Sequence, residues 1–163
     1  MKNAVLLFSL LGIMKMAGAQ KISLPELFSV LDLPADKIDT LMKHKEYRLM
    51  QKESDSGAKL VYYTNLERNP NGATWVRSLS YQEIVTKEVQ SRLVTYRTYR
   101  KKEYQELLEW LLRNNFKTVK QDNFGDYIDT VYFDGIVSIQ VKQAKQKLPS
   151  GVPVWSYEFE VGK

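Results

Sequence analysis

Acidic side chains near the C-terminal end are the residues whose types and spacing could do chemistry. They are Asp122, Asp126, Asp129, Asp134, Glu158 and Glu160. Two carboxylates that face each other across a cleft can hydrolyse a glycosidic bond, and several together can bind calcium. Their spacing does not fit an EF-hand loop, whereas aspartates close to Gly125 and Gly135 are typical of tight turns. The pattern therefore favours turn residues, and a hydrolase of envelope polysaccharide or glycan that uses paired carboxylates remains the alternative function.

Other catalytic and metal-binding patterns are scarce. His44 is the only histidine, and its place among charged residues near a predicted helix end is typical of a solvated side chain. An S-x-x-K pattern occurs at residues 56–59, but in a predicted turn and without its companion motifs. The chain has no cysteine, which excludes a thiol nucleophile, thiolate metal ligands, disulfides and a lipid-bearing cysteine. We expect no catalytic residue, no metal site and no cofactor, and thus a protein that is not an enzyme.

The first residues have the pattern of a secretory signal peptide. Lys2 supplies a positive charge, residues 4–14 form an apolar run, and Ala17 and Ala19 provide an A-x-A cleavage site before Gln20. The run is shorter than the roughly 20 apolar residues that a membrane-spanning helix needs. We therefore expect residues 1–19 to be a cleaved signal peptide, the mature chain to lack a membrane span, and the protein to be periplasmic or secreted.

The composition of the mature chain points to a bacterial envelope protein with a protein or envelope partner. Removal of residues 1–19, which hold two lysines and no acidic residue, leaves 144 residues and a formal charge of +3. A secreted chain of this size without disulfides is more typical of bacteria than of eukaryotes. Basic residues cluster at 97–102 and 142–147, but export argues against nucleic acid as the partner.

The first half of the mature chain is predicted to be two helices followed by strands. Ser23, Pro25 and Glu26 form a capping-box sequence, which predicts a helix that begins there, and a second helix is expected from Asp36. From Tyr47 the hydrophobic pattern changes from helical spacing to the alternation that is typical of strands. Strands are expected at residues 60–65, 75–81 and 93–100, while residues 82–92 fit either a strand with a bulge or a short helical turn.

The second half repeats the order of helix followed by strands. A helix is expected from Lys101, with Leu107 and Leu111 on its apolar face. The strands that follow are expected at residues 116–121, 127–133, 136–143 and 154–161. Asp134-Gly135 predicts a two-residue type I′ hairpin turn, because both residues tolerate a positive φ.

The two halves also agree residue by residue, which predicts a duplicated unit. Ile38, Leu41, Met42 and Tyr47-Arg48 match Leu107, Trp110, Leu111 and Phe116-Lys117 at the same offsets, and Val61-Tyr62-Tyr63 matches Val131-Tyr132-Phe133 after one inserted residue. We expect an α+β fold of two tandem helix-plus-antiparallel-strand repeats, residues 20–100 and 101–163, with the helices on one face of the sheet or sheets. The repeats could form one continuous domain. In general shape such units are similar to beta-lactamase-inhibitor-like domains, a likeness of architecture alone.

Aromatic residues are the main candidates for an interaction surface. Consecutive aromatic side chains in a strand point to opposite faces of the sheet, so one of each pair must point away from the core. The candidate surface residues are Tyr62, Tyr63, Trp75, Tyr96, Tyr132 and Trp155. Burial on both sides would explain them equally well, but tyrosine and tryptophan are enriched at interface anchors. The sequence thus predicts an exported, non-enzymatic binding module whose ligand and oligomeric state it does not define.

Overall fold

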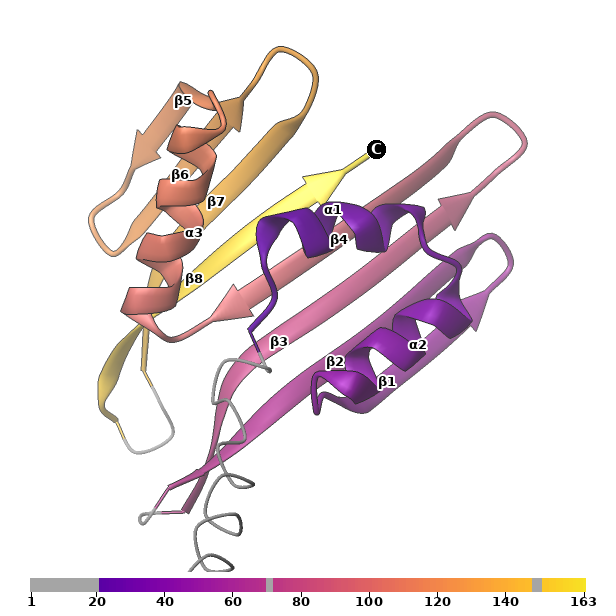
Figure 1. Ribbon diagram of the computed structural model, residues 1–163, viewed down its shortest axis with the longest axis horizontal. Helices are drawn as coiled ribbons and strands as arrows, with labels where there is room; N and C mark the ends of the chain where they lie inside the picture. Colours follow the sequence, from indigo (N-terminus) through magenta and orange to yellow (C-terminus); the bar gives the residue numbers. More distant parts are fainter. Residues whose placement is uncertain (1–20, 70–71, 148–150) are drawn as a thin grey trace, which may run out of the picture.

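The computed structural model describes residues 21–69, 72–147 and 151–163, with side chains described outside residues 66–75. Three helices and one antiparallel sheet of eight strands make an α+β fold (Figure 1). The strand order is β1-β2-β3-β4-β8-β7-β6-β5, so the two halves of the chain meet where β4 pairs with β8. The expected signal peptide and its cleavage site at Ala17, Ala19 and Gln20 lie outside the described residues.

The first half supplies two helices and four strands. They are α1 (Leu24–Asp32), α2 (Ala35–His44), β1 (Arg48–Asp55), β2 (Ala58–Asn69), β3 (Gly72–Val85) and β4 (Gln90–Thr98). The second half supplies α3 (Lys101–Arg113), β5 (Lys117–Asn123), β6 (Tyr127–Phe133), β7 (Ser138–Lys147) and β8 (Pro153–Gly162). No helix within these described segments has the length and apolar character needed to cross a membrane.

Burial alternates along the strands and so distinguishes the two faces of the sheet. On β4, Val94, Tyr96 and Thr98 are buried, while Leu93, Thr95 and Arg97 between them are partly exposed. The buried set continues into the hydrophobic core that includes α1, α2 and α3 residues such as Leu27, Met42 and Leu111. We call the face that carries Leu93, Thr95, Arg97 and their neighbours across the sheet the open face.

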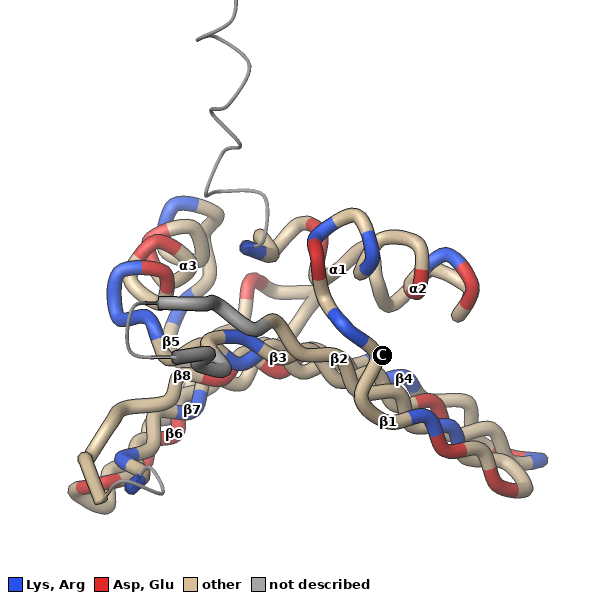
Figure 2. Tube along the Cα trace, turned by 90° about the horizontal axis from the view of Figure 1, so that it is seen from below, with Lys and Arg blue, Asp and Glu red and all other residues tan. Residues whose placement is uncertain are grey.

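The sheet is bent rather than flat. Seen edge-on in Figure 2, α1, α2 and α3 lie above the sheet, and both of its ends curve away from them. The backbone of the sheet is therefore concave on the side away from the helices. Contacts agree with this view, since α1 and α3 contact the central strands β4 and β8, and α2 contacts the edge strand β1.

The capping box predicted from the sequence is confirmed. The Ser23 backbone N–H donates to Glu26 Oε2 at 2.8 Å, and the Ser23 Oγ accepts from the Glu26 backbone N–H at 3.4 Å. Burial would raise the pKa of Glu26, but hydrogen bonds from Lys45 and Ser23 outweigh it and lower that pKa. The first helix is thus fixed both at its start and to the end of α2.

Two local irregularities recur at matching places in the halves. Glu46 and Asn115, each after the end of a helix, have positive φ values of 61° and 65°. The next strand then has a register shift, between Leu49 and Gln51 in β1 and between Thr118 and Lys120 in β5. Each shift marks one extra residue that bulges from an edge strand, which protects that edge against pairing with another chain.

The pairing register corrects the sequence comparison of the halves by one residue. Tyr63 lies opposite Leu49, and Tyr132 lies opposite Thr118, the residue that matches Leu49. Tyr63 and Tyr132 therefore occupy equivalent register positions, whereas Phe133 lies one residue further along its strand. Both rings are buried, because their positions face the core.

Two other local predictions are also changed. The connection between β6 and β7 has four residues, 134–137, instead of the two-residue type I′ turn. The reason is that Asp134 Oδ1 accepts hydrogen bonds from the backbone N–H groups of Ile136 and Val137, both at 2.8 Å, while Gly135 takes a φ of +105°. The undecided segment at residues 82–92 is resolved as strands, because β3 continues to Val85 and β4 begins at Gln90.

Candidate functional site

The six aromatic residues predicted as an interaction surface do not lie together. Tyr63, Tyr96 and Tyr132 are buried in the core, so they do not form surface. Trp155 shares the face of Tyr157 and Phe159 on β8 and is partly exposed. Trp75 lies in β3, but its side chain is outside the described part of the chain. Only Tyr62 is placed on the open face by the described side chains, because it alternates with the buried Val61 and Tyr63.

Charged side chains form a paired row across the middle of the open face. The register places Asp129, Lys142, Glu158 and Arg97 side by side on β6, β7, β8 and β4. Arg97 Nη2 lies 2.6 Å from Glu158 Oε2, and Lys142 Nζ lies 3.0 Å from Glu160 Oε2. Gln140 Nε2 donates to Asp129 Oδ2 at 2.7 Å.

These contacts keep both cations charged. Partial burial would lower the pKa of Lys142, but Glu160 and then Glu158 outweigh it and raise that pKa. Partial burial would likewise lower the pKa of Arg97, but the hydrogen bond and charge of Glu158 outweigh it and raise that pKa. The carboxylates of Glu158 and Glu160 are therefore both paired with cations of the same protein.

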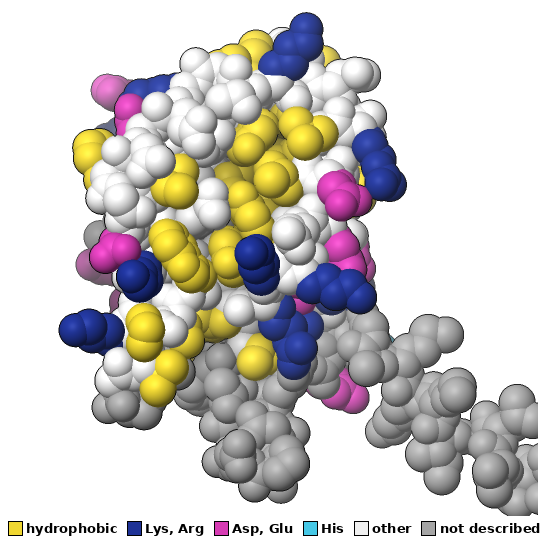
Figure 3. All heavy atoms as spheres, turned by 90° about the vertical axis from the view of Figure 1, so that its left-hand side faces the viewer, with side chains coloured by type: hydrophobic (Ala, Val, Ile, Leu, Met, Phe, Trp, Pro, Cys, Tyr) yellow, Lys and Arg dark blue, Asp and Glu magenta, His cyan; other side chains and the backbone are white. Residues whose placement is uncertain are grey.

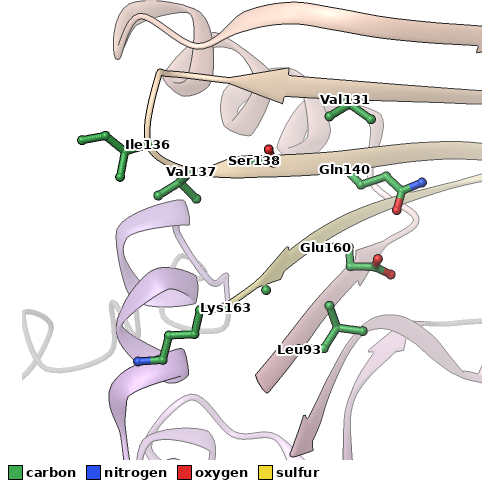
Figure 4. Close-up of a pocket in the computed structure, with 9 residues that line it drawn as sticks. Leu93, Val131, Ile136, Val137, Ser138, Gln140, Glu160 and Lys163 are labelled. Atoms are coloured by element: carbon green, nitrogen blue, oxygen red, sulfur yellow. The ribbon is translucent and has the colours of Figure 1, made fainter. Parts of the chain in front are cut away.

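Beside this row the open face has a hollow of about 730 Å³, which is lined by both apolar and polar side chains (Figure 4). Leu93 on β4 and Val131 on β6 form two of its walls, and Ile136 and Val137 from the β6–β7 connection border it. The polar side chains that line it are Ser138, Gln140, Glu160 and Lys163. Ile136 is 88% exposed, the largest exposed fraction among the exposed large hydrophobic side chains of the described residues.

The pairing of β4 with β8 and the β6–β7 connection explain the hollow. Gly162 pairs with Leu93 where β8 ends, and it contributes no side chain to the open face. A Cβ there would lie 3.3 Å from Leu93 Cδ1, so a larger residue would enter the hollow. The four-residue connection closed by Asp134 places Ile136 and Val137 at the opposite side.

No family model, curated protein or solved structure matches this chain. The site must therefore be judged by its own geometry. Its residues Leu93, Val131, Ile136 and Gly162 were not among those singled out from the sequence. The signal that could have found Leu93 is its alternation with the core residues Val94 and Tyr96, which places it on the opposite face.

The acidic residues that the sequence offered as a carboxylate pair or calcium site make separate contacts and do not form one cluster. Asp122 binds Lys120 at 2.7 Å, Asp126 binds Lys145 at 3.3 Å, and Asp134 accepts from the backbone. Among the residues that the structure describes, no group of three histidine, cysteine or carboxylate side chains could hold a metal ion. His44 is the last residue of α2, as expected, and residues 56–59 span the β1–β2 turn.

A second apolar region lies on another side of the molecule. Figure 3 shows hydrophobic side chains gathered into a band on the side that carries α3 and β5, with charged side chains beside it. Leu112 on α3 and Val119 on β5 are exposed. These two positions offer exposed apolar controls for the hollow.

Proposed function

We propose that this protein is an exported, non-enzymatic binding module that holds a protein partner against the open face of its sheet. The observation that carries the proposal is the hollow bordered by Leu93, Val131 and the exposed Ile136. Interface anchors are typically apolar side chains seated in a pocket and surrounded by groups that exclude water. Export rests on the signal-peptide pattern of residues 1–19.

The architecture supports this use of the sheet. We propose that the chain is a tandem duplication in which the helices pack on one face and leave the other for a partner. The matching positive φ values at Glu46 and Asn115, and the matching bulges in β1 and β5, support the duplication. Joining the copies through β4 and β8 gives one wide, bent surface, larger than either copy could offer.

The partner's contact in the hollow is expected to be apolar. Arg97, Lys142, Glu158 and Glu160 already neutralise one another on this face. Charges that are paired within one protein contribute little to attracting a partner, whereas burial of apolar surface is the dominant favourable contribution to most protein association. An aliphatic or aromatic side chain of the partner therefore fits the hollow best.

Site-specific photo-crosslinking in cells that carry the gene tests the proposal. A photoreactive phenylalanine derivative replaces Ile136 at the hollow or, as the matched control, the exposed Leu112 on α3. We expect a discrete protein adduct from position 136 and none from position 112. Mass spectrometry of the adduct identifies the partner protein. The free partner is then purified, and its affinity for the unmodified protein is measured.

The alternative glycan hydrolase predicts a different result. It would give turnover on an envelope polysaccharide that is lost in Glu158→Gln or Glu160→Gln, without a protein adduct at position 136. That outcome would reject the binding module. The pairing of both glutamates with Arg97 and Lys142 favours the binding module over the hydrolase.

A further inference from the structure

A second groove, of about 460 Å³, lies between α1 and α3 and adjoins the hollow of the open face. Phe28 and Leu31 of α1 line one side, and Trp110 of α3 with Phe116 lines the other. Val137, Gly162 and Lys163 line both the groove and the hollow, so the two sites meet at the end of β8. Its volume and its largely apolar lining are within the range of small-molecule sites.

Three aromatic rings form the apolar end of the groove. The ring centroids of Phe28 and Trp110 are 6.2 Å apart, those of Phe28 and Phe116 are 6.4 Å apart, and those of Trp110 and Phe116 are 6.3 Å apart. Phe28 and Trp110 are only partly buried, so aromatic surface remains available in the groove. The face of an aromatic ring carries negative electrostatic potential and attracts cations, including quaternary ammonium groups.

The polar lining of the groove is also suited to a cation. Asp32 is the last residue of α1, and Asn114 caps the C-terminal end of α3, so both helices present their negative ends to it. Asp134 adds a second carboxylate. Hydrogen bonds from the Val137 and Ile136 backbone lower the pKa of Asp134, which keeps it ionised. Lys163 is the cation within the groove lining, and its ammonium group binds Asp32.

We propose that this groove binds a small amphiphilic organic cation, with its alkyl or aryl part against Phe28, Trp110 and Phe116 and its ammonium group near Asp32 and Asp134. The Lys163 ammonium group is paired with Asp32, the carboxylate that the ligand's ammonium group would contact. Lys163 therefore competes with the ligand, and its removal strengthens binding. This site does not depend on the protein partner proposed for the open face.

The test uses three probes of equal chain length: hexyltrimethylammonium, 1-hexanol and hexyl sulfate. Isothermal titration of the purified protein measures affinity for each probe. We expect the cation to bind at least tenfold more tightly than the alcohol, and the sulfate to bind most weakly. Lys163→Gln should tighten cation binding several-fold, and Asp32→Asn should weaken it several-fold.

A matched pair of variants locates the site. Trp110→Leu should abolish detectable cation binding, whereas Leu112→Ala, on the same helix but outside the groove lining, should not change it. Far-ultraviolet circular dichroism and the unfolding midpoint show whether each variant is folded, and Phe28→Leu provides a second groove variant if Trp110→Leu is not. No cation binding, equal binding of hexyl sulfate, or retention of affinity in the folded groove variant would overturn the proposal.

Discussion

Two arginine–glutamate pairs lie on opposite faces of the same sheet and differ mainly in their exposure to water. Arg77 of β3 lies 2.8 Å from Glu103 of α3, and the two side chains are 6% and 5% exposed. Arg97 of β4 lies 2.6 Å from Glu158 of β8, with side chains 38% and 16% exposed. The distances are similar, so burial must decide what each pair does.

The buried pair connects the two halves of the chain, because β3 belongs to the first half and α3 to the second. Tyr96 also donates to Glu103, which gives this buried carboxylate a further partner. On the open face, the central pair Thr95–Glu160 has Arg97–Glu158 on one side and Leu93–Gly162 on the other. One side is thus filled by an ion pair and the other forms the hollow. The comparison teaches that similar ion pairs can lie in a buried core and on a partly exposed face of the same sheet, where their contributions to stability should differ.

The largest effect is expected from breaking the buried pair. Glu103→Ala leaves Arg77 without its carboxylate in a buried site and should reduce the free energy of unfolding by about 3–5 kcal/mol. Urea denaturation followed by circular dichroism measures it. The double variant Arg77→Met, Glu103→Leu should recover much of the loss, because well-packed apolar residues often replace a buried ion pair without cost. A loss below about 1 kcal/mol in Glu103→Ala would contradict the distinction between the two faces.

The open-face pair should contribute much less. Arg97→Ala is expected to lower the free energy of unfolding by about 1 kcal/mol or less, because solvent screens a partly exposed pair. A double-mutant cycle with Glu158→Gln isolates the interaction itself. A coupling free energy as large as that of the buried pair would show that the open face also depends on ion pairs for stability.

The smallest effect concerns the turn that borders the hollow. Because backbone hydrogen bonds lower the pKa of Asp134, its ionised form stabilises the folded state above the ordinary aspartate pKa of about 3.9. That stabilisation is lost as pH falls through the lowered value. Asp134→Asn should therefore unfold at slightly lower urea concentration at neutral pH and show no difference at pH 2. A difference that persists at pH 2 would mean that the carboxylate charge is not responsible.

Features that depend on neighbouring residues could be predicted from the sequence. The capping box at Ser23 and Glu26, the helix from Lys101 and the alternating strand of β8 all follow from short-range patterns. The α+β class follows from their order. The predicted two-residue turn at Asp134-Gly135 was wrong, because the Asp134 carboxylate binds backbone groups of the next residues and extends the connection.

The candidate site could not be predicted because it depends on strand register. Tyr96 and Leu93 belong to the same strand, yet one is core and the other open face. Aromatic content drew attention to Tyr96, whereas the hollow depends on Gly162 lying opposite Leu93, a pairing between residues far apart in the chain. Only the pairing of β4 with β8 brings them together.

The most direct test of the central proposal is the affinity of the crosslinked partner for two charge-insertion variants. Leu93→Glu places a carboxylate in the hollow, and Leu112→Glu places one on the exposed face of α3. Both variants should fold, and unfolding midpoints check this. We expect Leu93→Glu to raise Kd at least tenfold and Leu112→Glu to leave it within twofold. Unchanged affinity in folded Leu93→Glu, or a loss confined to Leu112→Glu, would contradict the open face as the binding surface.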